Sequence, residues 1–226
     1  MATFINFSEE NEQKMKSCME TVTENFENIL RENGESLTSL CQEVNYEPVV
    51  EHVTKVMGDL YDEVQGACEK KFQEWQDSNA GFKNQAKTLK AGEDAEMQAE
   101  RMEEGLFDIQ KTFWDRKPLG EPDELKVDTH KPLGDPDMLE FLIEIYEGAR
   151  ESIEEERDNA VRQIKEDDED DTFSTMEIVI NRFAKPMIDY FDQLAKDADG
   201  FVEETRQNMK QNRNNIAEEQ EASKNR

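Results

Sequence analysis

The sequence predicts an all-α protein: an elongated bundle of long amphipathic helices with coiled-coil-like seams. Apolar residues recur at alternating steps of three and four, which places them on one stripe of an α-helix, and charged residues cover the rest. Such stripes leave water only by packing against one another, so we expect antiparallel helical hairpins. The clearest stripes are Val49, Val53, Val56, Leu60, Val64, Cys68, Phe72 and Trp75, and Ala95, Ala99, Met102, Leu106, Ile109 and Phe113.

Residues 1–114 are assigned to an N-terminal helical unit. The first helix carries an apolar stripe from Met15 to Leu30, and acidic residues occupy its first turn. Glycine is common just after a helix end, so Gly34 is expected to terminate this helix. A second, shorter helix is then expected over residues 36–44.

A long helical hairpin is expected over residues 49–114. Asn45 is a candidate cap for its first helix, and Pro48 suits the first helical turn because proline lacks an amide hydrogen. The polar turn 77–81 should lead into the second arm, which ends near Trp114. A short connection between two long amphipathic helices predicts antiparallel packing.

Residues 115–136 are expected to form a linker, because four of the six prolines lie in this stretch. It contains a near-duplication: residues 117–125 and 131–139 are identical at seven of nine positions and share the pattern Lys-Pro-Leu-Gly-acid-Pro-Asp. One interpretation is a slipped duplication that lengthened a semi-rigid spacer. The alternative is a recognition peptide displayed twice.

Residues 137–226 are expected to form a C-terminal helical hairpin. Asp135 followed by Pro136 has the form of a helix start, with a capping carboxylate before a proline. The acidic run 166–171 should separate the two helices, since acids oppose the dipole at a helix C-terminus. Beyond about residue 203 the chain has few apolar residues, and we expect a frayed polar tail.

A formal net charge of -28 restricts the partners of this protein. An acidic surface repels nucleic-acid phosphates and anionic lipid headgroups, so nucleic-acid binding is not expected. Neither a run of 18 apolar residues nor a basic and apolar leader occurs, which argues against membrane insertion and a cleavable signal. We expect a cytoplasmic protein when folded, or one exported by a leaderless route.

The sequence predicts no enzyme, cofactor or metal site. The three cysteines, an odd number, are interpreted as reduced structural thiols. A di-iron bundle needs two Glu-x-x-His pairs, but Val49 precedes His52 and Val127 precedes His130 at that offset. Aspartates near Gly200 do not fit a calcium loop, and two histidines far apart in sequence are a poor basis for a catalytic triad.

The candidate protein-interaction residues are a tryptophan and an acidic run. Trp75 is singled out because it lies just before the predicted turn of the long hairpin. The acidic run closes segment 137–171, which holds 15 acids and 4 bases. It is interpreted either as a docking surface for a basic partner or as a solvated helix face with a loop. Its members are Glu166, Asp167, Asp168, Glu169, Asp170 and Asp171.

The stretch Phe72-Gln-Glu-Trp75-Gln-Asp-Ser-Asn-Ala-Gly81-Phe82 lies within the predicted hairpin. Two long helices joined by a short turn beside a tryptophan resemble the WXG100 proteins exported by type VII secretion systems. Asp77 stands where that family has the glycine of its Trp-x-Gly motif, and the export signature Tyr-x-x-x-acid does not occur. The resemblance implies a leaderless helical class of protein and transfers no functional residue.

We therefore expect a non-catalytic, acidic, helical interaction protein. It would be a substrate, adaptor or partner associated with secretion, binding other helices through its seams as a homo- or hetero-oligomer. The alternative is an acidic immunity or inhibitor protein that neutralises a basic toxin or nuclease. Electrostatic attraction would dominate the second mode, so salt should slow its association far more than that of seam docking.

Overall fold

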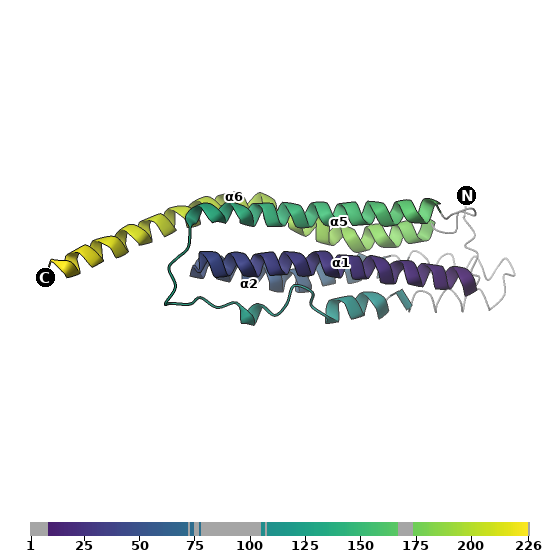
Figure 1. Ribbon diagram of the computed structural model, residues 1–226. Helices are drawn as coiled ribbons and strands as arrows, with labels where there is room; N and C mark the ends of the chain where they lie inside the picture. Colours follow the sequence, from purple (N-terminus) through teal and green to yellow (C-terminus); the bar gives the residue numbers. More distant parts are fainter. Residues whose placement is uncertain are drawn as a thin grey trace.

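A computed structural model describes residues 9–71, 73, 74, 77, 105, 106, 108–166 and 174–225. Every regular element within these ranges is helical, which confirms the all-α prediction, and together they form an elongated bundle (Figure 1). Residues 108–115 are also helical. The elements with defined bounds are α1 (Glu9–Val44), α2 (Glu47–Asp59), the π-helical turn η1 (Leu60–Val64), the 3₁₀ turns η2 (Pro122–Glu124) and η3 (Pro136–Leu139), α5 (Glu140–Glu166) and α6 (Ser174–Lys224).

The helices bury their apolar stripes in one core that runs along the bundle. In Figure 1, α1 lies between α5 on one side and α2 on the other, and α5 packs against both α6 and α1. Within this core Phe26 of α1, Phe113 and Phe183 of α6 meet, with ring centroids 5.6 Å (Phe26–Phe183) and 5.2 Å (Phe113–Phe183) apart. Residues from both predicted helical units belong to this core.

The prediction that Gly34 ends the first helix is wrong, because α1 is continuous from Glu9 to Val44. Gly34 is instead a point of close contact. A Cβ atom at this position would lie 2.9 Å from the carbonyl oxygen of Leu119. Only glycine lets the backbone of residues 115–136 approach the helix this closely. The contact compensates for the low helix propensity of glycine.

The duplicated segment packs against the bundle. We call residues 117–139 the strap. Leu119 of the first copy is buried, and its amide donates a hydrogen bond to the Tyr61 hydroxyl at 2.7 Å. The second copy approaches the end of α1, where a Cβ on Gly134 would lie 2.2 Å from the Glu43 carbonyl oxygen. Gly120 and Gly134 have φ of 87° and 80°, a conformation that glycine adopts without steric cost.

Asn45 does not cap α2, contrary to the sequence prediction. The N-cap is Tyr46, which makes no capping hydrogen bond with its side chain, while Pro48 does lie in the first turn. Asn45 has φ of 39° and is buried. Its side chain accepts from the Asp128 amide and donates to the Asp128 carbonyl, both at 2.8 Å. It therefore holds the strap at the corner between α1 and α2.

The C-terminal helices begin as predicted but end differently. Asp135 Oδ1 accepts a hydrogen bond from the Asp137 amide at 3.0 Å, which confirms the predicted helix start. The expected fraying beyond residue 203 is not seen, because α6 remains helical to Lys224 and projects past the bundle (Figure 1). None of the helices in the described ranges is long and apolar enough to span a membrane.

The contact at Gly34 predicts opposite effects for two glycine-to-alanine changes within helices. Gly34→Ala should lower the free energy of unfolding by roughly 1–3 kcal/mol, because the new methyl group meets backbone that cannot easily move. Gly148→Ala should raise it by up to about 1 kcal/mol, because a Cβ there meets nothing within 4 Å and alanine favours the helix. Urea denaturation followed by circular dichroism measures both.

Gly148→Ala is the matched control for this experiment, since both substitutions add the same atoms to a long helix. Equal effects of the two substitutions would contradict the close contact between α1 and the strap.

Candidate functional site

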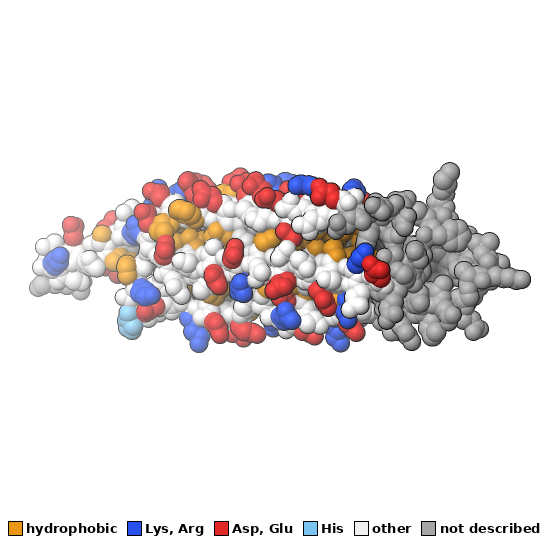
Figure 2. Space-filling model, turned by 45° about the vertical axis from the view of Figure 1, so that its right-hand side comes forward, with side chains coloured by type: hydrophobic (Ala, Val, Ile, Leu, Met, Phe, Trp, Pro, Cys, Tyr) orange, Lys and Arg blue, Asp and Glu red, His pale blue; other side chains and the backbone are white. Residues whose placement is uncertain are grey.

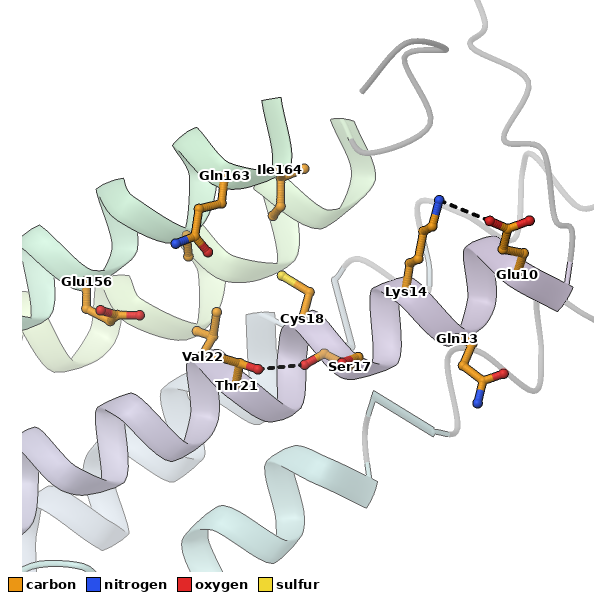
Figure 3. Close-up of a pocket in the computed structure, with 11 residues that line it drawn as sticks. Glu10, Gln13, Lys14, Ser17, Cys18, Thr21, Val22, Glu156, Gln163 and Ile164 are labelled. Carbon is orange, nitrogen blue, oxygen red and sulfur yellow. Dashed lines mark hydrogen bonds and ion pairs between the residues drawn. The ribbon is translucent and has the colours of Figure 1, made fainter. Parts of the chain in front are cut away.

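A groove runs between the first half of α1 and the second half of α5 (Figure 3). It has a volume of about 690 Å³ and opens to solvent. Two elements far apart in the sequence form it, so its residues do not appear together in any sequence motif. The lining residues are Glu10, Gln13, Lys14, Ser17, Cys18, Thr21, Val22, Glu156, Ala160, Gln163 and Ile164.

The floor of the groove is apolar. Val22, Ala160 and Ile164 are buried members of the core, and Cys18 is half-buried among them. The Cys18 thiol points toward α5 in Figure 3, across from Ile164. Cys18 and Ala160 have short side chains, and short side chains on both helices leave the surface between them hollow.

The rim of the groove is polar and is held by contacts within α1. Lys14 Nζ lies 3.3 Å from Glu10 Oε1, and the Thr21 hydroxyl donates to the Ser17 carbonyl at 3.0 Å. At one end Asn25 Nδ2 donates to Glu156 Oε1 at 2.6 Å and ties α1 to α5. An apolar floor between polar rims suits apolar side chains carried on an amphipathic helix.

The outer face of α5 carries a second feature, which we call the acidic ridge. Its residues follow one another at steps of three and four, so they share one helix face, and all are exposed. Arg206 Nη2 contacts Glu140 at 2.7 Å, whereas Glu144, Glu147 and Glu155 make no ion pair with any described residue. In Figure 2 acidic side chains are spread over the described face with Lys and Arg side chains between them, and apolar side chains lie mainly along its middle. The ridge consists of Glu140, Glu144, Glu147, Glu151, Glu155 and Asp158.

The structure describes only one of the interaction residues singled out in the sequence. Glu166 is exposed at the end of α5, while Trp75 and Asp167 to Asp171 lie outside the described residues. Sequence reasoning missed the groove, for which the only signal is two small residues, Cys18 and Ala160, on apolar stripes. It counted the acidic ridge only as part of the charge of segment 137–171.

His52 belongs to a packed cluster that joins three helices. Its Nε2 lies 2.8 Å from the hydroxyl of Tyr146 in α5, and its ring stacks on Phe201 of α6 with centroids 4.3 Å apart. Burial, with a smaller contribution from Lys55, lowers the pKa of His52 below its ordinary value of 6.5. Burial raises the pKa of the Tyr146 hydroxyl well above 10. Both groups therefore stay neutral at pH 7 and serve as packing partners.

Burial also makes the two buried cysteines, Cys41 and Cys68, poor nucleophiles. Burial raises the pKa of the Cys41 thiol and of the Cys68 thiol to about 12, so neither forms a thiolate near neutral pH. The described ranges contain no group of three or more His, Cys, Asp or Glu residues arranged to hold a metal ion.

The lowered pKa of His52 predicts a loss of stability in mild acid. Folding opposes protonation of this imidazole, so the unfolded chain binds the proton more tightly. The contribution of His52 is therefore complete above about pH 6.5 and is lost as the pH falls below that value. Thermal denaturation from pH 7.5 to pH 5 should show a shallower decline for His52→Gln than for the unmodified protein.

His130→Gln is the control, because His130 is exposed on the strap. The decline with pH should be unchanged in this variant. An identical decline in His52→Gln would show that the buried imidazole does not contribute.

Comparisons with protein families, with curated proteins and with solved structures find no match for this chain.

Proposed function

We propose that this chain is a non-catalytic helical interaction protein that binds an amphipathic helix of another protein in the α1–α5 groove. The observation that carries the proposal is the groove itself. It combines an apolar floor of Val22, Ala160 and Ile164 with a polar rim on an otherwise strongly charged surface. Apolar grooves between helices are the usual receptors for amphipathic helices.

The dimensions of the groove support this occupant. The α1 wall runs from Glu10 to Val22, which corresponds to about 18 Å at 1.5 Å per residue. That length accepts about three turns of a helix, with apolar anchors at positions i, i+4, i+7 and i+11. Glu10, Lys14 and Glu156 on the rim would fix the orientation of the bound helix through its polar flanks.

The proposal includes the secretion-associated role that the resemblance to WXG100 proteins implies. One observation supports the hairpin on which this resemblance rests: the end of predicted hairpin 49–114 contacts the middle of its first arm. The rings of Trp114 and Tyr61 pack edge to face there, with centroids 6.0 Å apart. A substrate, adaptor or partner of a secretion system would use the groove to recognise another helical protein.

A second candidate function is inhibition of a basic toxin or nuclease. The acidic ridge favours it, because six exposed carboxylates form one row and Glu144, Glu147 and Glu155 have no ion-pair partner among described residues. A partner with a row of Lys or Arg side chains would meet this row with complementary charge.

Filling the groove should abolish capture of a groove-binding partner. Ser17→Trp places an indole on the exposed rim, where it covers the apolar floor without entering the core. Affinity capture from cells should then lose the partner protein, with at least about a tenfold drop in affinity once it is purified.

Ser36→Trp is the matched control, since it makes the same change at an exposed position of α1 outside the groove. This variant should bind normally. A partner that binds Ser17→Trp and Ser36→Trp equally would rule out the groove as its site.

Salt and charge reversal separate the two candidate functions. For groove binding, the association rate should change little between low and high salt, and Glu144→Lys with Glu147→Lys should have little effect. For a basic partner on the acidic ridge, high salt and the double charge reversal should each slow association by about tenfold or more. Stopped-flow or biosensor measurements give the rate.

The control for charge reversal is Glu32→Lys with Glu35→Lys, which changes the net charge equally on exposed α1 positions. Slowing by the ridge variant alone would favour the inhibitor function over groove binding. Equal slowing by both variants would indicate long-range steering without a ridge contact.

A further inference from the structure

The end of α6 projects beyond the bundle as a single helix (Figure 1). We call residues 210–224 the overhang. Every one of its side chains is exposed, and Ile216, the large apolar residue among them, retains 47% of its accessible surface. Asn212 Nδ2 donates to the Tyr46 hydroxyl at 3.3 Å. After Asn212, no side chain of the overhang bonds to another described residue.

The composition of the overhang gives it little helix stability of its own. It continues α6 and so needs no nucleation, but most helical stability in proteins comes from tertiary packing. The overhang also contains Asn212, Asn214 and Asn215, which favour helices less than alanine does. After Asn212, the side chains of the overhang obtain no such packing from the described residues of their own bundle.

The first two bases of the overhang are unpaired along the helix. Lys210 and Arg213 come first, the acids Glu218, Glu219 and Glu221 follow, and Lys224, three positions after Glu221, ends the overhang. Side chains on a helix pair at steps of three or four, and no base here lies three or four positions before an acid. Lys210, Arg213, Glu218 and Glu219 therefore have no complementary charge at these steps within the same helix.

An antiparallel pair of overhangs removes this mismatch. If two copies align with Ile216 beside Ile216 on a two-fold axis, residues equally far from Ile216 come level with each other. Arg213, three positions before, then comes level with Glu219, three positions after, and both lie within about 60° of Ile216 around the helix. Each such contact occurs twice, as a symmetric interface requires.

We propose that the overhang is a homodimerisation element, and that its partner is the overhang of a second copy of this chain in antiparallel orientation. Charge complementarity between its two halves selects the partner and the orientation. The antiparallel arrangement also places the two bundles at opposite ends of the pair. Their net charges of -28 are then kept apart, whereas a parallel pair would bring them side by side.

The test measures the mass of the full-length protein by sedimentation over a range of concentrations. The mass should rise toward twice that of one chain as concentration increases. Ile216→Asp and Arg213→Glu should each lower the association constant at least about tenfold. Ile216→Asp places a charge in the centre of the interface, and Arg213→Glu places an acid level with Glu219 of the second copy. Combining Arg213→Glu with Glu219→Arg should restore dimerisation, because the pair is rebuilt with reversed charges.

Lys111→Glu is the matched control: it makes the same charge change at an exposed position of helical segment 108–115 and should leave association unchanged. Circular dichroism checks that each variant keeps its folded bundle. The proposal is overturned if the full-length protein stays monomeric at every concentration. It is equally overturned if Ile216→Asp and Arg213→Glu leave dimerisation unchanged. The same holds if Arg213→Glu combined with Glu219→Arg does not restore it.

Discussion

Burial of a narrow, continuous apolar seam is the constraint on which this structure depends. The net charge of -28 opposes compaction, and the chain has few apolar residues to counter it. Each fully buried large side chain, such as Phe26 or Leu142, contributes roughly 1.5–3 kcal/mol. Many ion pairs, such as Lys185–Asp189, lie exposed within one helix and add little. The elongated shape follows, because thin stripes can all be buried only by helices that run side by side.

The strap buries few of its apolar side chains completely, so close backbone contacts hold it against the bundle in place of a large buried apolar surface. Its two copies are placed by glycines: Gly34 on α1 opposite Leu119, and Gly134 on the strap opposite the end of α1. Asn45 adds hydrogen bonds with the main-chain amide and the main-chain carbonyl of Asp128. These contacts tie α1, α2 and the start of α5 to one another, so the proline-rich segment becomes part of the folded bundle.

Periodicity predicted the helices well because the seam imposes it on every residue of an element. It could not predict Gly34 or Asn45, since both are determined by the strap, more than 80 residues away in the sequence. Glycine after a helix and asparagine before one have the same local appearance whether they terminate, cap or make a distant contact. The groove was hidden for a related reason: Cys18 and Ala160 read as ordinary core residues until α1 and α5 are placed together. Trp75 and the acids from Asp167 to Asp171 lie outside the described residues, so their proposed role stays a prediction.

The seam also explains why the candidate interaction sites are where they are. A bundle that needs nearly all of its apolar residues for its own core can offer partners only the places where the seam is incomplete. The α1–α5 groove is one such place, because the short side chains of Cys18 and Ala160 leave a hollow between the two helices. The overhang is another, because α6 continues after the helices that cover it have ended. Ile216 is exposed there in a protein whose described residues hide most other large apolar side chains. The fold depends on packing the apolar stripe of one helix against that of another. At both sites the same kind of contact would be made with a second molecule.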